Sequence, residues 1–461
     1  MFRFRVTLLV LSAIVLSAVK PVVTVFGSDK ELSSSLQVIL LCHPYTKANV
    51  LPFTLAGIES QVYPKNRINI FIKTEVYNSV FDGTFNSSIP KFDFNRDTVN
   101  ILRKWVKNNR DHYNDVDLQI DVLDSDDDLE PENIEYWSSN RFKKIMDLKN
   151  RALRYSRRKW ADFVLFIDAD VVLTNVNTFA NMINKNHTIV SPMLYSLGTY
   201  SNFWAGITER GYYKRTDDYL PILERQTEGE FEVPMIHSCV FINLRKESSM
   251  LLTFNASELS DIPYDDIIAF AVSARRNSIP MIVNNMQVWG FILPPIENLE
   301  LQELDTALVD LELEAISERS LFPISSSLLE FVKRPEKTKA GVDNIYLINL
   351  LRRPDRLEKM LISFNAMGLT VQLWPAVDGQ KITEQYLSDL GIKVIPGYLD
   401  PYHKRPITYG EIGCFLSHYF IWEDMITRNL SKVIVLEDDV RFEQKFTQRM
   451  NKAVSALESA H

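Results

Sequence analysis

The chain has 461 residues, of which 46% are hydrophobic and 24% are charged, and its formal net charge is −8 at neutral pH. Its length exceeds that of one ordinary domain, and its balance of apolar and charged residues excludes a largely disordered chain. The negative charge argues against a nucleic-acid partner, which would favour a basic surface.

The first residues predict a secretory signal peptide. Arg3 and Arg5 precede an apolar run that is too short for a comfortable membrane span. We expect cleavage near Gly27, which assigns residues 1–27 to the signal and leaves a mature chain without a membrane span; an uncleaved anchor is the alternative. Four N-x-S/T sequons become candidate N-glycosylation sites in such a chain: Asn86, Asn186, Asn255 and Asn429.

Three cysteines are too few for a disulfide framework. Cys42 and Cys414 lie in apolar settings, which predict buried thiols. A bridge between Cys42 and Cys239 remains open.

The first unit, residues 35–293, opens with an alternation of strand and helix patterns. Apolar runs at 35–45 and 67–76 flank a helical segment, an order that indicates a parallel α/β sheet. A basic amphipathic helix over 140–159 then leads into the strand FVLFIDADVVL, which carries Asp168 and Asp170 at its tip.

Acids in this position favour a cation site. Ligands bind beyond the carboxyl ends of strands in open parallel sheets. Asp168 and Asp170 can share one Mg²⁺ or Mn²⁺ ion, which keeps part of its coordination shell for phosphate oxygens. A turn or helix-cap role is the alternative. The arrangement returns after the run VIVL, where three acids follow: Glu437, Asp438 and Asp439.

Between the two acidic tips the composition changes. Residues 294–340 are acidic and leucine-rich, which predicts a connecting helix or packed linker; a coiled coil is less favoured because the heptads are few. In the second unit, residues 341–461, a strand beginning at Asn344 is followed by a helix that starts at Pro354 and stops at Gly368. A further strand, a helix over 408–426 and the acid-tipped strand then repeat the plan of the first unit.

Four ordered blocks of the second unit resemble glycosyltransferase family 25: YLINLLRRPDRLEKM, PAVDG, GEIGCFLSHYFIWEDMI and VIVLEDDVRFE. The first unit, with FIDADVV after DLKNRALRYS, resembles the N-terminal domain of the animal members, which modify procollagen. The resemblance implies an α/β fold of two tandem GT-A-like (Rossmann-type) glycosyltransferase units. The second unit is expected to be incomplete, since only residues 440–461 follow its acids, and the chain resembles a C-terminally shortened member.

The resemblance also implies a reaction and its partners. Galactose would pass from UDP-galactose to hydroxylysine of collagen, with Mn²⁺ (or Mg²⁺), in the lumen of the endoplasmic reticulum, although no retention tetrapeptide ends this chain. A homo-oligomer is left open. Because the acceptor half of the second unit is missing, we expect little activity from this chain alone. A non-catalytic binding or adhesion protein, or an inactive truncated form, is the alternative.

Candidate roles follow for single residues. Forming a β-linkage from an α-linked donor inverts the anomeric centre and calls for a general base, for which Asp265 and Asp266 are candidates; helix capping is their alternative. Candidates for nucleotide contacts follow the strands of the second unit: Arg352, Arg353, Arg356 and Asp378. His237 (metal shell) and Trp204 and Trp289 (sugar pocket) each have core packing as the alternative. Cys414 and His418, four residues apart on one helix face, do not make a metal site as a pair and are expected to pack against the sheet.

Overall fold

The computed structural model describes residues 33–42, 48–77, 94–123, 139–209, 212–255, 265–295 and 301–460. The expected signal peptide and the sequon at Asn86 lie outside the described residues. Within them, no helix is long and apolar enough to cross a membrane.

The larger part of the molecule is built on an eight-stranded sheet with the order β3-β2-β1-β4-β10-β6-β11-β8. Its strands are β1 (Leu36–Cys42), β2 (Ile68–Tyr77), β3 (Asp115–Leu123), β4 (Phe163–Asp168), β6 (Ile189–Pro192), β8 (Glu230–Val233), β10 (Cys239–Asn243) and β11 (Met281–Asn284). Its helices are α2 (Leu51–Glu59), α3 (Phe94–Asn109), α4 (Ser139–Arg158), α5 (Thr178–Asn184), α6 (Tyr219–Leu223) and α7 (Asp266–Arg276).

The sheet is mixed. The expected parallel pairing holds from β3 through β2 and β1 to β4. Beyond β4 the expectation of a parallel sheet is wrong, because β10 runs antiparallel to both of its neighbours and β8 runs antiparallel to β11. β10 is preceded along the chain by the short strand β9 and not by a crossover helix of the kind that joins parallel neighbours. A fully buried strand is an apolar run in either direction, and the sequence pattern therefore does not report its direction.

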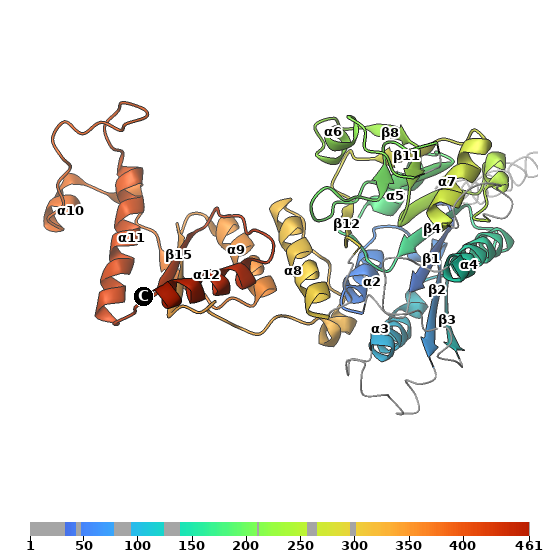
Figure 1. Ribbon diagram of the computed structural model, residues 1–461, viewed down its shortest axis with the longest axis horizontal. Helices are drawn as coiled ribbons and strands as arrows, with labels where there is room; N and C mark the ends of the chain where they lie inside the picture. Colours follow the sequence, from blue (N-terminus) through green and yellow to red (C-terminus); the bar gives the residue numbers. More distant parts are fainter. Residues whose placement is uncertain are drawn as a thin grey trace, which may run out of the picture.

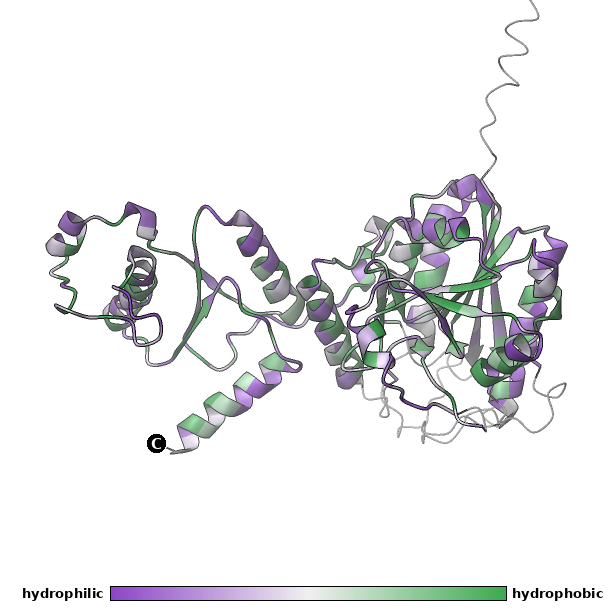
Figure 2. Ribbon diagram, turned by 90° about the horizontal axis from the view of Figure 1, so that it is seen from above, coloured by the Kyte–Doolittle hydropathy of each residue, from purple (hydrophilic) through white to green (hydrophobic). Residues whose placement is uncertain are grey.

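Helices cover both faces of this sheet (Figure 1). Alternate residues of β1 point to opposite faces. Leu36, Val38 and Leu40 pack in one core with residues of α2 and α3, whereas Ile39 packs in a second core with residues of α4 and α7. Figure 2 shows hydrophobic residues along the strands and hydrophilic residues on the outer sides of the helices. Two short strand pairs complete this part: β5 (Val171–Leu173) with β12 (Gly290–Ile292), and β7 (Phe203–Trp204) with β9 (Met235–Ile236).

The smaller part contains a parallel three-stranded sheet with the order β14-β13-β15. Its strands are β13 (Asn344–Asn349), β14 (Gln372–Pro375) and β15 (Val433–Glu437), and its helices are α9 (Pro354–Met367), α10 (Glu384–Asp389), α11 (Tyr409–Thr427) and α12 (Phe446–Ala460). The expected start and stop of α9 are confirmed, with Pro354 in its first turn and Gly368 at φ 68°.

The two sheets place their acidic strands in the same position. In each sheet the first strand of the unit is central, the next strand lies on one side and the acid-tipped strand lies on the other, as β2-β1-β4 and β14-β13-β15. The residue registers agree as well, since Asp168 pairs with Leu41 and Glu437 pairs with Ile348 near the ends of the central strands.

Helix α8 (Leu301–Ser317) lies between the two parts (Figure 1). Leu308, Leu311 and Ala315 on one side of α8 belong to a hydrophobic cluster with residues of α2, β5 and β12. Leu313 and Ile316 belong to a different cluster, with residues of β13 and α9. The helix predicted in this acidic, leucine-rich segment is therefore present, and it contributes to the cores of both parts.

Candidate functional site

The first acidic tip is held in a fixed turn. The N–H of Asp168 donates to the carbonyl of Ser238, at 2.8 Å. The hydroxyl of Thr54 on α2 donates to the carbonyl of Ala169, at 2.9 Å, and the N–H of Leu293 donates to the carbonyl of Asp170, at 3.3 Å. Three hydrogen bonds from different segments thus hold the backbone turn between β4 and β5. Asp168 is half-buried and Asp170 is buried.

Two glycines allow β5 to pass close behind this turn. A Cβ atom on Gly290 would overlap the carbonyl oxygen of Val172, and one on Gly57 would lie 2.8 Å from the carbonyl oxygen of Leu173. Real Cβ atoms do not approach backbone this closely, so both positions require glycine. The strand that leaves the acidic tip is therefore packed backbone to backbone between α2 and β12.

Asp168 lines a small cavity together with Lys149, His237 and Asp266. The cavity measures about 20 Å³, which holds a water-sized occupant but not a nucleotide. The ammonium group of Lys149 lies 2.5 Å from a carboxylate oxygen of Asp266, and both side chains are almost fully buried. Burial lowers the pKa of Lys149, but Asp266 and then Asp168 raise it by more, so its pKa lies above the ordinary value. Lys149 is thus charged.

Asp265 caps α7. Its carboxylate oxygen accepts from the N–H groups of Ile267 and Ile268, at 2.8 and 3.0 Å. Asp265 thus caps the helix, and its neighbour Asp266 is the ion-pair partner of Lys149. Burial, and then the charge of Asp266, raise the pKa of Asp265 above its ordinary value. A carboxylate with a raised pKa is a stronger base.

His237 and Tyr200 adjoin the same acids. Burial lowers the pKa of His237 to about 4, so its imidazole is neutral at physiological pH. Burial, and then the charges of Asp170 and Asp168, raise the pKa of Tyr200 above its ordinary value. The Tyr200 and His237 rings lie 6.0 Å apart between centroids. Ser238, next to His237, has a left-handed backbone with φ 62°, a strained conformation that recurs at functional sites.

Lys149 and Tyr200 were not singled out from the sequence. Lys149 belongs to a helix whose exposed face is rich in basic residues, and no periodicity distinguishes a buried lysine from its exposed neighbours. Among the residues with open alternatives, Trp289 is a core residue: it is 1% exposed and donates from its indole nitrogen to Asn284, at 3.1 Å. Trp204 is half-buried against Tyr213.

The second acidic tip divides into two groups: Glu437 is the last residue of β15, and Asp438 and Asp439 lie in the turn that follows it. Asp438 and Asp439 lie with Arg356 of α9, whose Nη1 atom is 3.0 Å from an oxygen of each. The amide nitrogen of Asn349, at the end of β13, donates to Asp438 at 2.6 Å. Two carboxylates and one amide thus converge at the end of the central strand.

Glu437 faces the other way, toward α11. One of its carboxylate oxygens lies 3.2 Å from Nε2 of His418 and 3.6 Å from Sγ of Cys414. Of the two candidate partners of Asp439, it is therefore Asp438 and not Glu437 that shares a contact with it. The expectation of a buried Cys414 thiol is wrong, because this residue is exposed. Cys42 and Cys239 are both buried and remain reduced thiols, so the bridge between them is not formed.

The candidate nucleotide contacts of the second part occupy the same edge of its sheet but have different partners. Arg352, after β13, lies 3.4 Å from Asp378, after β14. Arg353 instead donates twice to Asp355 in the first turn of α9, at 2.9 and 3.0 Å, which is a local helix-end contact. Arg352 and Asp378 therefore lie together, whereas Arg356 contacts the two aspartates of the tip and Arg353 contacts its own helix.

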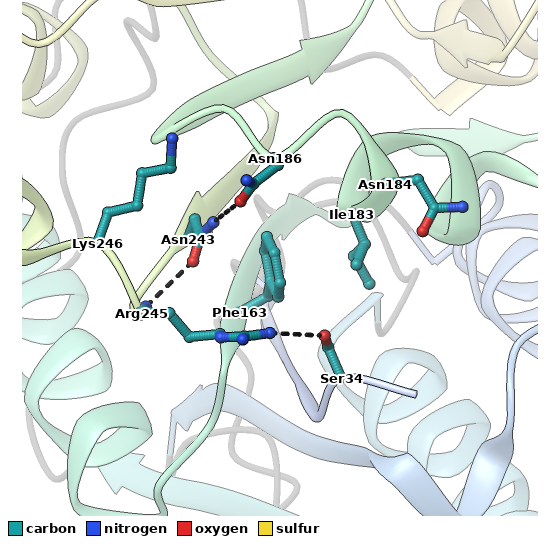
Figure 3. Close-up of a pocket in the computed structure, with 8 residues that line it drawn as sticks. All are labelled: Ser34, Phe163, Ile183, Asn184, Asn186, Asn243, Arg245 and Lys246. Carbon is teal, nitrogen blue, oxygen red and sulfur yellow. Dashed lines mark hydrogen bonds between the residues drawn. The ribbon is translucent and has the colours of Figure 1, made fainter. Parts of the chain in front are cut away.

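A larger hollow lies elsewhere. It measures about 440 Å³ and adjoins Phe163, at the opposite end of β4 from the acids. Figure 3 shows that amide and basic side chains line it, among them Asn186, Asn243 and Arg245. None of its lining residues is an acid, so it is not the cation site. Asn186 is one of the sequons; it and Asn429 are exposed, whereas Asn255 is half-buried.

Sequence comparison identifies the relatives of both parts. The family described as glycosyltransferase family 25, N-terminal domain, matches residues 34–311. The family described as glycosyltransferase family 25 (LPS biosynthesis protein) matches residues 342–461. The matched segments contain the two acidic tips.

Individual relatives agree with these matches. The chain is 42% identical to a glycosyltransferase 25 family member of Aedes aegypti, over 93% of this chain and 68% of that protein. It is 40% identical to human procollagen galactosyltransferase 2, over 90% of this chain and 63% of that protein. Among solved structures, S. aureus TarS matches with a TM-score of 0.32 and 13% identity, over 61% of this chain and 44% of that chain, a likeness too weak to bear on function.

Proposed function

Because the chain belongs to glycosyltransferase family 25, we propose that it is of the type that transfers galactose from UDP-galactose to hydroxylysine of collagen chains, with inversion. The observation that carries the proposal is the repeated placement of acids at the carboxyl end of a strand beside the central strand of each sheet. Crevices at this edge of parallel strands are where ligands bind in open α/β sheets.

The proposal includes two tandem GT-A-like units, over residues 35–293 and 341–461, joined by residues 294–340. The shared strand order β2-β1-β4 and β14-β13-β15 supports it. The joining segment also contributes to packing, since residues of α8 belong to the hydrophobic cores of both units.

A divalent cation, Mn²⁺ or Mg²⁺, fits the donor sets at both tips. Asp168 and Asp170 supply carboxylate oxygens, the ligands that hard cations prefer. At the second tip, one oxygen each of Asp438 and Asp439 already converges on a single positive nitrogen of Arg356. A bound cation would neutralise charge that develops on the diphosphate leaving group.

The residues of the first unit can serve the rest of the reaction. As the acceptor oxygen bonds to C1 of the sugar, the bond from C1 to the diphosphate oxygen breaks and its electron pair leaves with UDP. The hydroxyl proton passes to a base. We assign that role to Asp265 rather than Asp266, because the raised pKa of Asp265 makes its carboxylate more basic, whereas Lys149 holds Asp266 in its ion pair. In the second unit, Arg352, Arg356 and Asp378 are proposed nucleotide contacts.

The remaining assignments concern the cellular location, the acceptor and the glycosylation of the protein. We propose a protein of the secretory pathway in the endoplasmic reticulum, with collagen or procollagen chains as acceptors and glycans on its sequons. The exposed positions of Asn186 and Asn429 support glycan attachment there.

The proposal is tested by binding and turnover on the purified chain. Titration with UDP-galactose, with and without Mn²⁺, is paired with galactose transfer to deglycosylated collagen. We expect Asp168→Asn or Asp439→Asn to weaken Mn²⁺-dependent binding at its own tip, by at least the roughly 10–100-fold that altered support of a metal ligand causes. Asp217→Asn and Asp389→Asn, at exposed acids of the two units, are the matched controls.

The outcomes separate the proposal from its rival. Transfer that requires Mn²⁺ and an intact tip supports the enzyme. Donor binding without transfer favours a non-catalytic binding or adhesion protein on the same scaffold. Binding that is indifferent to Mn²⁺ and to both tip variants would overturn the assignment of the acids.

A further inference from the structure

Cys414, His418 and Glu437 form a cluster that the proposed transfer reaction does not use. Cys414 and His418 are four residues apart on α11, so their side chains lie on the same face of the helix. Glu437 ends β15 and points toward that face. One potential ligand atom of each residue, namely sulfur, imidazole nitrogen and carboxylate oxygen, lies within 4.8 Å of the other two.

The separations match those of ligands on one tetrahedral ion. With zinc bonds of about 2.3 Å to sulfur and about 2.0 Å to nitrogen and oxygen, tetrahedral angles require about 3.5 Å between sulfur and oxygen and about 3.3 Å between nitrogen and oxygen. The structure has 3.6 Å from Cys414 Sγ to Glu437 Oε1, and 3.2 Å from His418 Nε2 to the same oxygen. Zinc could therefore bind with little change in the sulfur–oxygen and nitrogen–oxygen separations.

We propose that Cys414, His418 and Glu437 bind a zinc-like divalent transition-metal ion through one sulfur, one nitrogen and one oxygen ligand, with a fourth position open to solvent. The cluster is accessible for this purpose: Cys414 is exposed, and the side chains of His418 and Glu437 are 28% and 49% exposed. Three protein ligands with one open position is the pattern of reactive rather than purely structural zinc sites.

The ligand chemistry separates this site from the acids beside it. Thiolate and imidazole select zinc and related ions, whereas carboxylates alone suit Mg²⁺ and Mn²⁺. Asp438 and Asp439 contact Arg356 of α9, so they belong to the other group. The strand tip would then offer two unlike ion sites, and loss of one would leave the other intact.

The alternative is a set of surface hydrogen bonds in which the Cys414 thiol and the His418 ring donate to Glu437. Such contacts hold no ion, and they would exist without any selectivity for metals. The two cases differ in whether the Cys414 sulfur becomes bound to metal.

Alkylation of the unaltered chain distinguishes them without a mutation. All three cysteines are described, and Cys414 alone among them is exposed, so iodoacetamide should label it first. We expect one equivalent of Zn²⁺ to slow the labelling of Cys414 by about tenfold or more, since the free thiolate is the nucleophile. Mn²⁺ at the same concentration should have little effect. Equal labelling with and without Zn²⁺, or equal protection by Mn²⁺, would overturn the proposal.

Cobalt spectroscopy then assigns the ligands. Co²⁺ bound to a thiolate should give a near-ultraviolet charge-transfer band that saturates at one equivalent and disappears when Zn²⁺ is added. We expect Cys414→Ser to abolish the band, and His418→Gln and Glu437→Gln to weaken Co²⁺ binding. Cys42→Ala and Asp439→Asn should leave the band unchanged, each with folding checked by circular dichroism.

A band that survives in Cys414→Ser, or that is lost in Asp439→Asn, contradicts the assignment. Neither readout depends on galactose transfer, so failure here and failure of the proposed function are distinguishable.

Discussion

At both strand tips a basic side chain meets the carboxylates, but the two pairs differ in burial. Lys149 and Asp266 have side chains that are 15% and 8% exposed, whereas Asp439, beside Arg356, is 59% exposed. Removing one partner of a buried pair leaves a charge without compensation, at a cost of about 3–5 kcal/mol, while exposed pairs contribute about 0–1 kcal/mol. The Lys149–Asp266 pair therefore contributes far more to stability through its charge compensation than the exposed Arg356–Asp439 pair does.

This difference predicts the effect of removing Lys149. We expect Lys149→Met to lower the free energy of unfolding by about 3–5 kcal/mol, because Asp266 is left buried without its counter-ion. Lys159→Met is the matched control: it lies on the same part of the chain and pairs with Asp115, but both side chains are more than 40% exposed, so we expect a loss of about 0–1 kcal/mol.

Chemical denaturation followed by circular dichroism measures both values. A double variant, Lys149→Met with Asp266→Asn, should recover part of the loss, since no unpaired charge remains. Equal losses for Lys149→Met and Lys159→Met would contradict the buried ion pair.

At the scale of elements, the short strand β5 decides how the first acids are presented. It begins directly after Asp170 and is packed between α2 and β12, where Gly57 and Gly290 let the backbones approach. The backbone that carries the acids at the tip of β4 is therefore held by two structures: the main sheet, and the β5–β12 strand pair outside it.

The packing of β5 predicts a strong effect of a single methyl group. We expect Gly290→Ala to destabilise the fold by roughly 1–3 kcal/mol, because the added Cβ would overlap the carbonyl of Val172 and force the two strands apart. Gly229→Ala is the control, since its nearest neighbour would be a Phe231 ring atom at an ordinary 3.5 Å, and we expect a change within about 0.5 kcal/mol. Unfolding midpoints of both variants give the comparison, and similar values for the two would refute the close approach.

At the scale of the whole molecule, α8 couples the two sheets. Its opposite sides belong to separate hydrophobic clusters, one with β5 and β12 and one with β13 and α9. A polar contact adds to this arrangement, since Arg441, after β15, donates to Glu314 of α8 at 2.6 Å. Disturbing α8 should therefore affect both parts of the protein.

Leu311 provides the test, because it is fully buried on the side of α8 that faces the larger part. We expect Leu311→Ala to cost about 2–5 kcal/mol through lost contacts and the cavity left behind. Hydrogen exchange should rise in β12 and, through α8, also in β13. Leu321→Ala, at a leucine of the same segment that is 53% exposed, should change neither. Faster exchange confined to β12 would show that the two parts are stabilised independently.

Much of this organisation could be predicted from the sequence. Apolar runs located β1, β2, β4, β13, β14 and β15, and the helix signals at Pro354 and Gly368 placed α9 between its true ends. The positions of Asp168, Asp170 and the acids after β15 at strand tips followed from the same runs. These features are local, because burial of a strand and the start or end of a helix depend on residues a few positions apart.

The tertiary structure alone decided which groups meet. Lys149 reaches Asp266 across more than a hundred residues, and β10 runs against its neighbours although its apolar run suits either direction. At the second tip, the fold places Glu437 beside Cys414 and His418 of α11, and it places the two aspartates of the following turn beside Arg356 of α9. The sequence by itself determined that acids end these strands; which partner each acid has depends on the helix that packs on each face, and that is a property of the folded sheet.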